Sequence, residues 1–413
     1  MKAKLTYRIL RNFFLSIGVG LLFFAGGYNF AKVKYVGGSN SATIRRFVEN
    51  PQTKMAEGAD FSKFWEVWQR LEESFVEPEL IDYREMTWGS MKGLASSLGD
   101  PYTQYLPPAQ NKTANEDLNG SFYGVGIELG YKDQTLAVIS PLKNSPADLA
   151  GIKAGDLILN IKDDKKGLDV ETRGMTLPEA VTNIRGEKGT EVVLTLYREG
   201  IVEPFDTMIV RGEIVVPSVE VEYLSESGKK IARLSLHKFG GRTDKEWAEK
   251  VGEILANKVD GVILDLRNNP GGYLDGAAYV SGEFLPFGET VVEQRGRVGN
   301  EVKKVDRRGS LTTIPLVVLV NKGSASASEI TAGALKDHGR AKIVGETTFG
   351  KGTVQEVQDL SDGSSLHVTI AKWMTPNGNW IDKEGIKPDV EVQDDIKTED
   401  VDEQLVKALG LFN

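Results

Sequence analysis

Two apolar runs restrict the fold of this chain more than any other feature. They are GVIL at residues 261–264 and IPLVVLV at residues 314–320, and both are of strand length. Short apolar runs bounded by turn signals are typical of buried strands. Between residues 219 and 392 such runs alternate with helical patterns, which favours an α/β core.

A chain of 413 residues has room for two to four domains, and other elements flank this core. Apolar side chains at spacings of three and four predict a helix whose stripe consists of Phe61, Phe64, Trp65, Trp68, Leu71 and Phe75. A second helix is expected over residues 83–98. The two would form a hairpin within an N-terminal helical region, residues 59–110. The aromatic stripe would serve either as packing surface or as a homodimer contact.

The N-terminus predicts a membrane-directed segment. Basic residues at positions 2, 4, 8 and 11 precede an uncharged, apolar stretch from Asn12 to Ala31. This order is typical of a signal peptide or a signal anchor, and about 20 apolar residues span a bilayer as a helix. We therefore expect residues 1–34 to be a signal or anchor and residues 35–58 a linker. The rest of the chain would then lie outside the cytoplasm, in a bacterial cell envelope.

The composition excludes several classes of function. A net charge of −9 argues against a nucleic-acid partner, because phosphate binding needs clustered positive charge. The lack of cysteine removes thiolate nucleophiles and zinc–thiolate sites. Only three histidines occur, His237, His338 and His367, and the sequence has no HExxH motif. We therefore expect neither a metal site nor a cofactor.

Residues 119–212 carry strand patterns interrupted by glycines, and they resemble a PDZ domain. The resemblance rests on YGVGI at residues 123–127 and SPADLAGIKAGD at residues 145–156. In PDZ domains the N–H groups of such a loop bind the C-terminal carboxylate of a peptide, which adds as a strand to the sheet edge. The resemblance implies a peptide or protein partner with an apolar C-terminus, bound by Tyr123, Gly124, Val125, Gly126 and Ile127.

Three serines alternate with alanines where the second apolar run meets a helical segment, in VNKGSASASE at residues 320–329. A serine in the first turn of that helix would lie beside free N–H groups and the positive end of the helix dipole. This position suits a nucleophile and an oxyanion. Serine is also a preferred N-cap residue, so the three serines taken alone fit simple capping better.

Two further segments favour catalysis. DLRNNPGG at residues 265–272 follows the first apolar run, and ligands of α/β sheets gather at such strand ends. FGKGTVQ at residues 349–355 places Lys351 between glycines, with Thr353 and Gln355 on the same face of a strand. Neither a GxSxG nor a GNSGG motif occurs. A serine without histidine can use a lysine whose pKa burial has lowered, and an uncharged glutamine could hold that amine.

These segments together indicate a family. From about Phe61 to Val392 the chain resembles the carboxyl-terminal processing peptidases, also called tail-specific proteases. The resemblance is carried by LDLRNNPGG, VNKGSASASEITAGALKD, GETTFGKGTVQ and TPNGNWIDKEGIKPDV. It implies an α/β (α+β multidomain) fold: a crotonase-like protease core at residues 213–395, an inserted PDZ domain, an N-terminal helical hairpin and a C-terminal helix at residues 396–413.

The resemblance also assigns roles to single residues. Ser326 would be the nucleophile of a serine–lysine peptidase, and Lys351 would be its general base. Gln355 would be the partner of Lys351. The oxyanion hole would combine the N–H of Ala327 with one N–H of the pair Gly271 and Gly272.

Three hypotheses about function remain open at this point. The first is an envelope serine endopeptidase that selects protein substrates by their C-terminal tails. The second is a catalytically silent, membrane-tethered PDZ adaptor, which the intact set of Ser326, Lys351 and Gln355 disfavours. The third is a non-proteolytic crotonase-like enzyme, which the PDZ-like region disfavours.

Asp337 matches an aspartate of the family that the chain resembles. It lies several helical turns from Ser326, so a structural role is expected.

Overall fold

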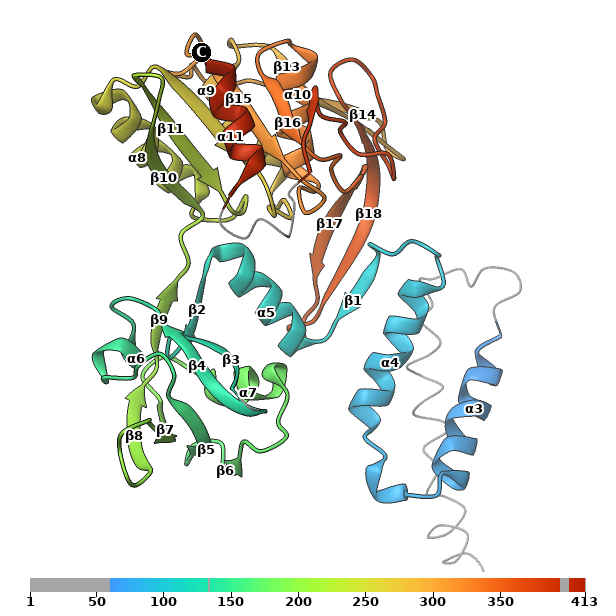
Figure 1. Ribbon diagram of the computed structural model, residues 1–413. Helices are drawn as coiled ribbons and strands as arrows, with labels where there is room; N and C mark the ends of the chain where they lie inside the picture. Colours follow the sequence, from blue (N-terminus) through green and yellow to red (C-terminus); the bar gives the residue numbers. More distant parts are fainter. Residues whose placement is uncertain (1–59, 133, 394–400, 413) are drawn as a thin grey trace, which may run out of the picture. The chain divides into compact units, whose positions relative to one another are not determined.

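The computed structural model describes residues 60–132, 134–393 and 401–412 (Figure 1). Contacts divide the chain into two units, residues 1–82 and residues 83–413. The predicted signal or anchor at residues 1–34 and the linker at residues 35–58 lie outside the described residues. Within the described ranges, no helix combines the length and the apolarity that crossing a bilayer requires.

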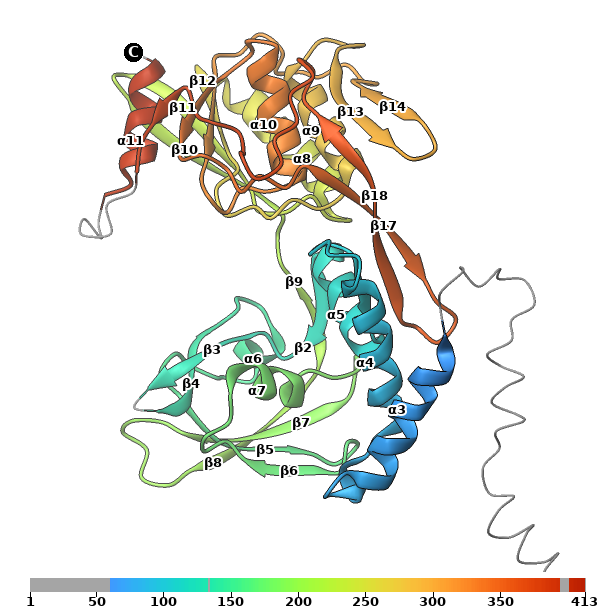
Figure 2. The same ribbon diagram turned by 90° about the vertical axis from the view of Figure 1, so that its right-hand side faces the viewer.

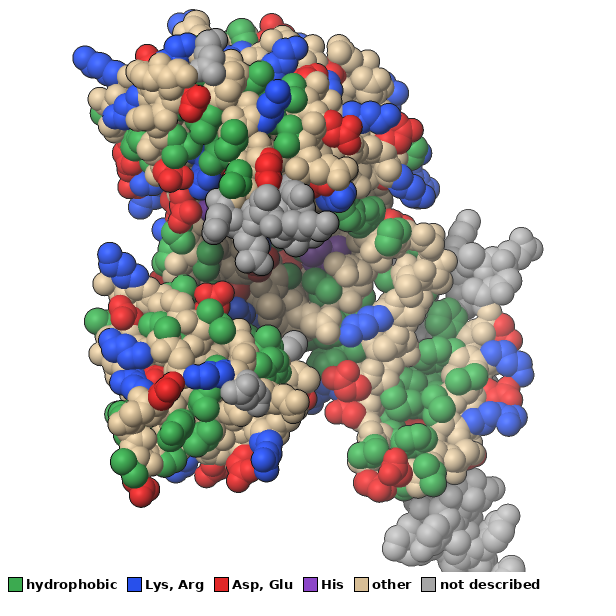
Figure 3. Space-filling view, viewed as in Figure 1, with side chains coloured by type: hydrophobic (Ala, Val, Ile, Leu, Met, Phe, Trp, Pro, Cys, Tyr) green, Lys and Arg blue, Asp and Glu red, His purple; other side chains and the backbone are tan. Residues whose placement is uncertain are grey.

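The described part of the first unit consists of helix α3 (Phe61–Ser74) and a 3-10 turn, η2 (Pro78–Leu80). Asp60 caps α3 by accepting a hydrogen bond from the Ser62 N–H at 2.9 Å. Hydrophobic side chains remain exposed over this helix (Figure 3), and the large ones are Phe61, Phe64, Val67 and Leu71. The predicted helix is confirmed. Its pairing with the second helix stays a prediction, because that helix belongs to the other unit.

The second unit begins with helix α4 (Tyr83–Ser96), strand β1 (Gln104–Leu106) and helix α5 (Pro108–Asn119). β1 pairs antiparallel with β18 (Ser365–Met374) of the core, so that Gln104 lies opposite His367. The region predicted as helical, residues 59–110, therefore also contains a strand that pairs with the core. A three-residue strand is too short to show a period-two pattern, which is why periodicity does not reveal it.

Residues 121–215 form the expected PDZ-like region. Strands β2 (Ser121–Gly124) and β9 (Gly212–Val215) pair antiparallel at its two ends. Between them lies a sheet of order β3-β4-β5-β7-β8, with β6 paired to β5. The remaining bounds are β3 Ile127–Lys132, β4 Thr135–Pro141, α6 Pro146–Leu149, β5 Leu157–Asp163, β6 Leu168–Glu171, α7 Leu177–Ile184, β7 Glu191–Tyr197 and β8 Phe205–Val210. This region has a hydrophobic core of its own.

The C-terminal core is built on a six-stranded sheet of order β10-β11-β12-β15-β16-β19. The first pair is antiparallel and the other pairs are parallel. The strand bounds are β10 Val219–Glu226, β11 Lys229–Leu236, β12 Gly261–Asp265, β15 Leu316–Val320, β16 Lys342–Gly345 and β19 Val390–Glu391. β12 contains the first apolar run and β15 contains residues 316–320 of the second, and all residues of these two strands are buried.

Helices cover both faces of this sheet (Figure 2). Alternate residues of the central strands enter two different cores: Val318 of β15 packs in one, and Leu319 packs in the other. The first core lies under α8 (Thr243–Asn257), α9 (Leu274–Phe284) and α10 (Ala327–Asp337). The second lies under α11 (Glu403–Leu409) and the turn η3 (Gly410–Phe412). The predicted α/β core is confirmed.

A second sheet, of order β1-β18-β13-β14 with β17 paired to β18, completes the unit. Its other bounds are β13 Thr290–Gly296, β14 Asn300–Lys304 and β17 Thr353–Asp359. Lys351 lies just before β17. This sheet thus joins the segment that carries Lys351 to β1, which comes from the N-terminal part of the unit.

Candidate active site

The three serines of the opening motif have different surroundings. The Ser324 hydroxyl is buried and donates to the Leu266 carbonyl at 2.8 Å. The Ser328 hydroxyl is also buried and donates to the Asn269 carbonyl at 2.9 Å. Ser326 is half-buried at the N-cap of α10, and its hydroxyl donates to no acceptor in the described part of the chain. Of the three, Ser326 is the one whose proton is available for chemistry.

The backbone of Ser326 adopts φ 53° and ψ −114°, a conformation that L-residues rarely take. Such strain occurs mainly at functional sites, where the surroundings enforce it. Gly271 approaches this turn closely: a Cβ there would lie 2.7 Å from the Ala325 oxygen and 2.9 Å from the Ala327 nitrogen. Only glycine fits, so the glycine-rich loop and the serine turn are built to contact each other.

Lys351 is half-buried, and both its backbone and its side chain contact aromatic residues. Its carbonyl accepts a hydrogen bond from Trp373 Nε1 at 2.8 Å, and its Nζ lies 4.8 Å from the centroid of the Tyr102 ring. Burial lowers the pKa of Lys351, while the charges of Asp100 and Glu329 oppose that change. A lysine with a lowered pKa is the kind of base that a serine without histidine needs.

Glu329 connects the serine turn to the lysine segment, and the sequence analysis did not single it out. Its side chain is buried, and Oε2 accepts from the Ser326 N–H at 2.8 Å and from the Lys351 N–H at 2.9 Å. Oε1 accepts from the Thr348 hydroxyl and from the Gly350 N–H, both at 2.6 Å. One carboxylate thus fixes the proposed nucleophile and base relative to each other. The spacing Ser326-x-x-Glu329 matches a capping box and could have revealed it.

Gln355 lies on β17, two residues after Thr353. Its Nε2 donates to the Thr353 hydroxyl at 2.9 Å and to the Thr369 hydroxyl at 3.1 Å. No hydrogen bond joins Gln355 to Lys351 within the described residues. Because both amide hydrogens are engaged, the carbonyl oxygen is the end of this side chain left to accept from an amine. The role of Gln355 as partner of Lys351 stays a prediction.

The glycine-rich loop offers two backbone amides with different partners. The Gly271 N–H donates to Asn269 Oδ1 at 2.9 Å, whereas the N–H groups of Gly272 and Ala327 donate to no acceptor in the described ranges. Asn269 is fully buried, and its Nδ2 donates to the Leu236 carbonyl at 2.7 Å. The structure therefore distinguishes the two glycines, which the sequence does not.

Within the described residues, no hydrogen bond joins a histidine or Asp337 to Ser326 or Lys351. His237 contacts Glu220, and His338 Nε2 lies 2.7 Å from the Thr290 carbonyl. Asp337 accepts from the Asn377 N–H at 2.9 Å. His367 on β18 has a buried Nε2 without a partner among the described residues, and burial followed by the nearby Lys351 charge lowers the pKa of this imidazole.

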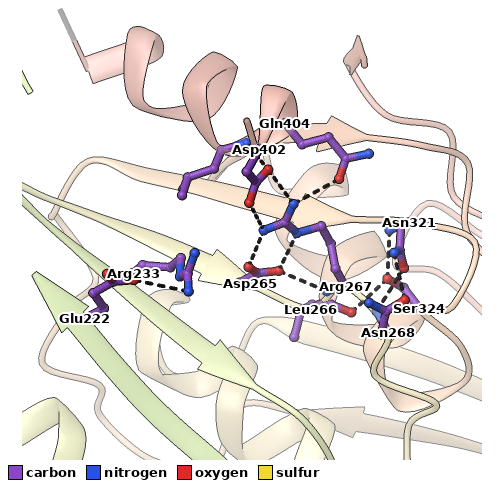
Figure 4. A network of polar contacts seen from close by, with 11 residues as sticks. Glu222, Arg233, Asp265, Leu266, Arg267, Asn268, Asn321, Ser324, Asp402 and Gln404 are labelled. Atoms are coloured by element: carbon purple, nitrogen blue, oxygen red, sulfur yellow. Dashed lines mark hydrogen bonds and ion pairs between the residues drawn. The ribbon is translucent and has the colours of Figure 1, made fainter. Parts of the chain in front are cut away.

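An ion-pair network joins the glycine-rich loop to the C-terminal helix (Figure 4). The Arg267 guanidinium binds both oxygens of Asp265, with its Nη2 2.8 Å from Asp265 Oδ2. It also binds both oxygens of Asp402, each at 2.8 Å. Arg267 Nη1 further donates to Gln404 Oε1 at 3.2 Å. Bidentate pairs of this kind fix geometry as well as adding energy.

Replacing Arg267 by methionine is expected to destabilise the protein by about 3 kcal/mol, because two partly buried carboxylates lose their counter-charge. Burial alone would raise the pKa of Asp402, but the hydrogen bonds from Arg267 and the Leu405 N–H hold it below its ordinary value of 3.8. The lowered pKa of Asp402 contributes to the free energy of unfolding. This contribution is fully present above pH 3.8 and is lost as the pH falls through the lower pKa of the folded state. The difference between wild type and variant should therefore shrink in acid.

Urea unfolding of both proteins between pH 3 and pH 7 measures this difference. The matched control is Arg295→Met, which removes a partly exposed pair with Glu293 at 3.0 Å. It should cost no more than about 1 kcal/mol. Equal losses in the two variants would contradict the assigned role of Arg267.

The PDZ-like region places the predicted peptide-binding residues in one loop. Tyr123 and Gly124 end β2, and Ile127 begins β3, an edge strand of its sheet. The N–H groups of Val125 and Gly126 between them bind no acceptor within the described residues. Gly126 has φ 77°, and a Cβ there would lie 2.4 Å from the Ser145 Cβ. An open edge beside free amides is the arrangement that strand addition uses.

Comparison with known proteins agrees with this architecture. Residues 230–392 match the sequence model of peptidase family S41, residues 113–197 match that of the PDZ domain, and residues 22–109 match that of the activating protease CtpB N-terminal domain. The fold is also similar to that of a Bacteroides fragilis protein described as an S41 protease, with a TM-score of 0.54, 16% identity and coverage of 83% of this chain and 95% of that one.

Two curated relatives come from Bacillus subtilis (strain 168). The carboxy-terminal processing protease CtpA is 37% identical over 334 residues, which are 81% of this chain and 69% of the relative. The carboxy-terminal processing protease CtpB is 35% identical over 315 residues, which are 76% of this chain and 64% of the relative. The similarity thus spans about two thirds of each relative's length. From these matches and the PDZ-plus-core architecture, this chain belongs to the carboxy-terminal processing proteases, serine-type peptidases of family S41 with a PDZ domain.

Proposed function

We propose that this chain is a serine endopeptidase that uses Ser326 and Lys351 to cleave protein substrates recognised through their C-terminal tails. The observation that carries the proposal is the shared contact with Glu329: one carboxylate oxygen accepts from the backbone N–H of both residues. Ser326 also has the uncommitted hydroxyl of its motif, and Lys351 has the lowered pKa. These features support acyl transfer by a serine–lysine pair.

In the first step, neutral Lys351 takes the proton of the Ser326 hydroxyl while Oγ attacks the carbonyl carbon of the scissile peptide bond. The new C–O bond forms a tetrahedral intermediate whose negative charge lies on the former carbonyl oxygen. We assign the Ala327 and Gly272 N–H groups to this oxyanion, because the Gly271 N–H is already committed to Asn269. Donors fixed in advance stabilise such a charge without reorganising.

In the second step, the Lys351 ammonium gives its proton to the leaving amine, and the C–N bond breaks to leave an acyl-enzyme on Ser326. Water then attacks the ester carbonyl while Lys351 takes a proton from that water. The bond between the acyl carbon and Ser326 Oγ breaks, Lys351 returns the proton to Oγ, and the acyl fragment leaves as a carboxylic acid. We propose that Gln355 holds the Lys351 amine through its carbonyl oxygen. A carboxylate at this position would raise the lysine pKa and oppose the reaction.

Substrate choice would rest on the loop from Tyr123 to Ile127 and on the edge strand β3. Free amides of Val125 and Gly126 suit a terminal carboxylate, and β3 suits an added strand. The relatives named as carboxy-terminal processing proteases support this substrate class. An apolar last side chain would enter the apolar core that surrounds Ile127 and Leu129.

Location and assembly are proposed on separate grounds. The basic and apolar pattern of residues 1–34 supports placement in a bacterial cell envelope, either anchored in the membrane or secreted after cleavage.

The exposed face of α3 supports a homodimer, because apolar side chains gathered on one helix face are typical of an interface. Sedimentation of the full chain with and without a Phe64→Glu substitution tests the dimer.

Cleavage of an unfolded protein that ends in an apolar tail tests the function. Wild type should cut it, and kcat/KM should fall about tenfold or more when the tail is made polar, because an apolar side chain in its pocket contributes about 1–3 kcal/mol. Replacing Gly126 by valine should erase this preference while leaving a slow, tail-independent cleavage. The Ser326→Ala variant lacks the proposed nucleophile and gives the background rate of cleavage.

Each outcome distinguishes between functions. Binding of the tail by folded wild type without any cleavage, at neutral or mildly alkaline pH, would favour the silent PDZ adaptor over the peptidase. Cleavage that survives in Ser326→Ala would show that another group is the nucleophile. Equal rates on apolar and polar tails would refute tail selection and leave the chemistry standing.

A further inference from the structure

The proposed base has a neighbour that belongs to none of the catalytic motifs. Lys351 Nζ lies 4.8 Å from the centroid of the Tyr102 ring. Tyr102 belongs to the segment of residues 99–106, which comprises the end of the connection from α4 and the strand β1. A cation within about 6 Å of a ring centroid is attracted by the negative face of the ring. This contact lies inside the second unit, between parts of the chain that are far apart in sequence.

The segment that carries Tyr102 is fixed to the sheet that carries Lys351. Asp100 accepts from the Tyr102 N–H at 3.2 Å and from the Thr103 hydroxyl at 2.6 Å. The buried Thr103 hydroxyl in turn accepts from the Thr369 N–H of β18 at 3.1 Å. β1 continues this attachment by pairing with β18. The backbone that carries the ring is therefore held by three hydrogen bonds and by strand pairing.

The same hydrogen-bond chain reaches the other proposed site residue. The Thr369 hydroxyl accepts from Gln355 Nε2 at 3.1 Å. Thr369 thus contacts the Tyr102 segment through its N–H and Gln355 through its hydroxyl. A shift of residues 99–106 would disturb the ring that contacts Lys351 and the support of Gln355 together.

We propose that Tyr102 is a positioning residue for the general base: the face of its ring holds the Lys351 amine, and residues 99–106 screen that amine from water. The inference rests on the proposed function, since it concerns the base of that reaction. The ring suits a base that must alternate between neutral and charged forms. It stabilises the ammonium formed when Ser326 loses its proton, yet it carries no formal charge that would keep the lysine protonated at rest.

The groups that face Lys351 come from several elements. Asp100 lies on the connection between α4 and β1, Glu329 on α10, and His367 on β18. Burial is the largest influence on Lys351 and lowers its pKa, while the two carboxylates oppose it. Burial also raises the pKa of the Tyr102 phenol, so the ring stays uncharged throughout the neutral range.

Tyr102 lies outside residues 230–392, which match the peptidase family, and inside residues 22–109, which match the N-terminal domain. The environment of the base is thus completed by a region that the peptidase match does not include. The inference extends the site from the catalytic motifs to this N-terminal part of the second unit.

The test compares the pH dependence of kcat/KM for the full-length wild type and three variants. Tyr102→Phe keeps the ring and should follow wild type. Tyr102→Leu keeps an apolar cover but removes the ring face, so its rising limb should move to lower pH and its plateau should fall. Tyr102→Ala admits water, so its limb should move to higher pH. At a fixed pH on that limb, kcat/KM rises about tenfold for each unit of displacement to lower pH and falls about tenfold for each unit of displacement to higher pH.

A second readout does not depend on turnover. Competitive labelling with acetic anhydride across the same pH range, followed by mass spectrometry of the peptide that contains Lys351, reports when this amine becomes neutral. Its midpoint should move down in Tyr102→Leu and up in Tyr102→Ala. If wild type cleaves nothing, the proposed function fails. The labelling midpoint still tests whether the Tyr102 ring affects the pKa of Lys351.

The control is Tyr105→Phe, a change to a neighbouring buried tyrosine of β1, which should leave both readouts unchanged. Thermal melting checks that each variant is folded, and Tyr102→Met replaces Tyr102→Leu if the latter is not. Profiles of Tyr102→Leu or Tyr102→Met that coincide with wild type in both readouts, or that move to higher pH, would overturn the inference.

Discussion

Replacing Lys351 by arginine is expected to stop proteolysis as completely as replacing it by methionine. An arginine keeps the positive charge but cannot give up its proton at any relevant pH, so it cannot accept one from Ser326. Burial lowers the pKa of Lys351, and this lowering is useful only if the neutral amine is the reactive form. Both variants should lose about four to six orders of magnitude in kcat, as variants lacking a nucleophile or base of such a unit do.

Initial rates of tail-substrate cleavage by Lys351→Arg and Lys351→Met measure this effect. Lys372 supplies the control, because it is an exposed lysine of β18 whose Nζ also lies over an aromatic ring, at 4.0 Å from that of Trp380. Lys372→Arg and Lys372→Met should cleave at wild-type rates. An arginine variant of Lys351 that retained a tenth of the wild-type rate would show that this residue acts by charge alone.

Removing the Glu329 carboxylate should have the second-largest effect, on both stability and activity. In Glu329→Ala, three backbone N–H groups and one hydroxyl lose their acceptor inside the protein. A buried donor left without a partner costs about 1–3 kcal/mol, so a total loss of at least about 3 kcal/mol is expected. Since this carboxylate also sets the spacing of Ser326 and Lys351, kcat should fall by about two orders of magnitude or more.

Glu329→Gln separates the two effects. The amide has one carbonyl oxygen and one donor group, so it satisfies only some of the four donors and points hydrogen atoms at the rest. We expect a folded protein with reduced stability, a reduced kcat and an unchanged KM, because the PDZ-like loop is not touched. Burial raises the pKa of Glu329, whereas the hydrogen bonds from Thr348, Lys351, Gly350 and Ser326 oppose that rise.

Unfolding by urea and labelling of Ser326 with a fluorophosphonate together measure the two effects. Glu346→Ala is the matched control, since the half-buried Glu346 pairs with the exposed Lys322 at 2.8 Å. It should change the free energy of unfolding by no more than about 1 kcal/mol. If Glu329→Ala reacted with the fluorophosphonate as fast as wild type, the carboxylate would not set the geometry of the site.

Some features of the fold were accessible from periodicity alone. The runs at residues 261–264 and 314–320 predicted buried strands, which form as β12 and as residues 316–320 of β15, and the stripe on α3 predicted a helix at the right place. β1 was missed, because a strand of three residues has too few positions for any period to show. Its existence depends on β18, more than 250 residues away in the chain.

The sequence by itself determined the class of fold and the chemical types at the site. Strand-length apolar runs require a buried sheet, and the motif around Ser326, with a lysine and no nearby histidine, restricts the base. Only the tertiary structure decided which groups are free to react. The hydroxyls of Ser324 and Ser328 donate hydrogen bonds to carbonyls of the glycine-rich loop, and the Gly271 N–H donates to the side chain of Asn269. Hydrogen-bond partners from distant segments assign these roles, and residue order alone does not specify which distant groups meet.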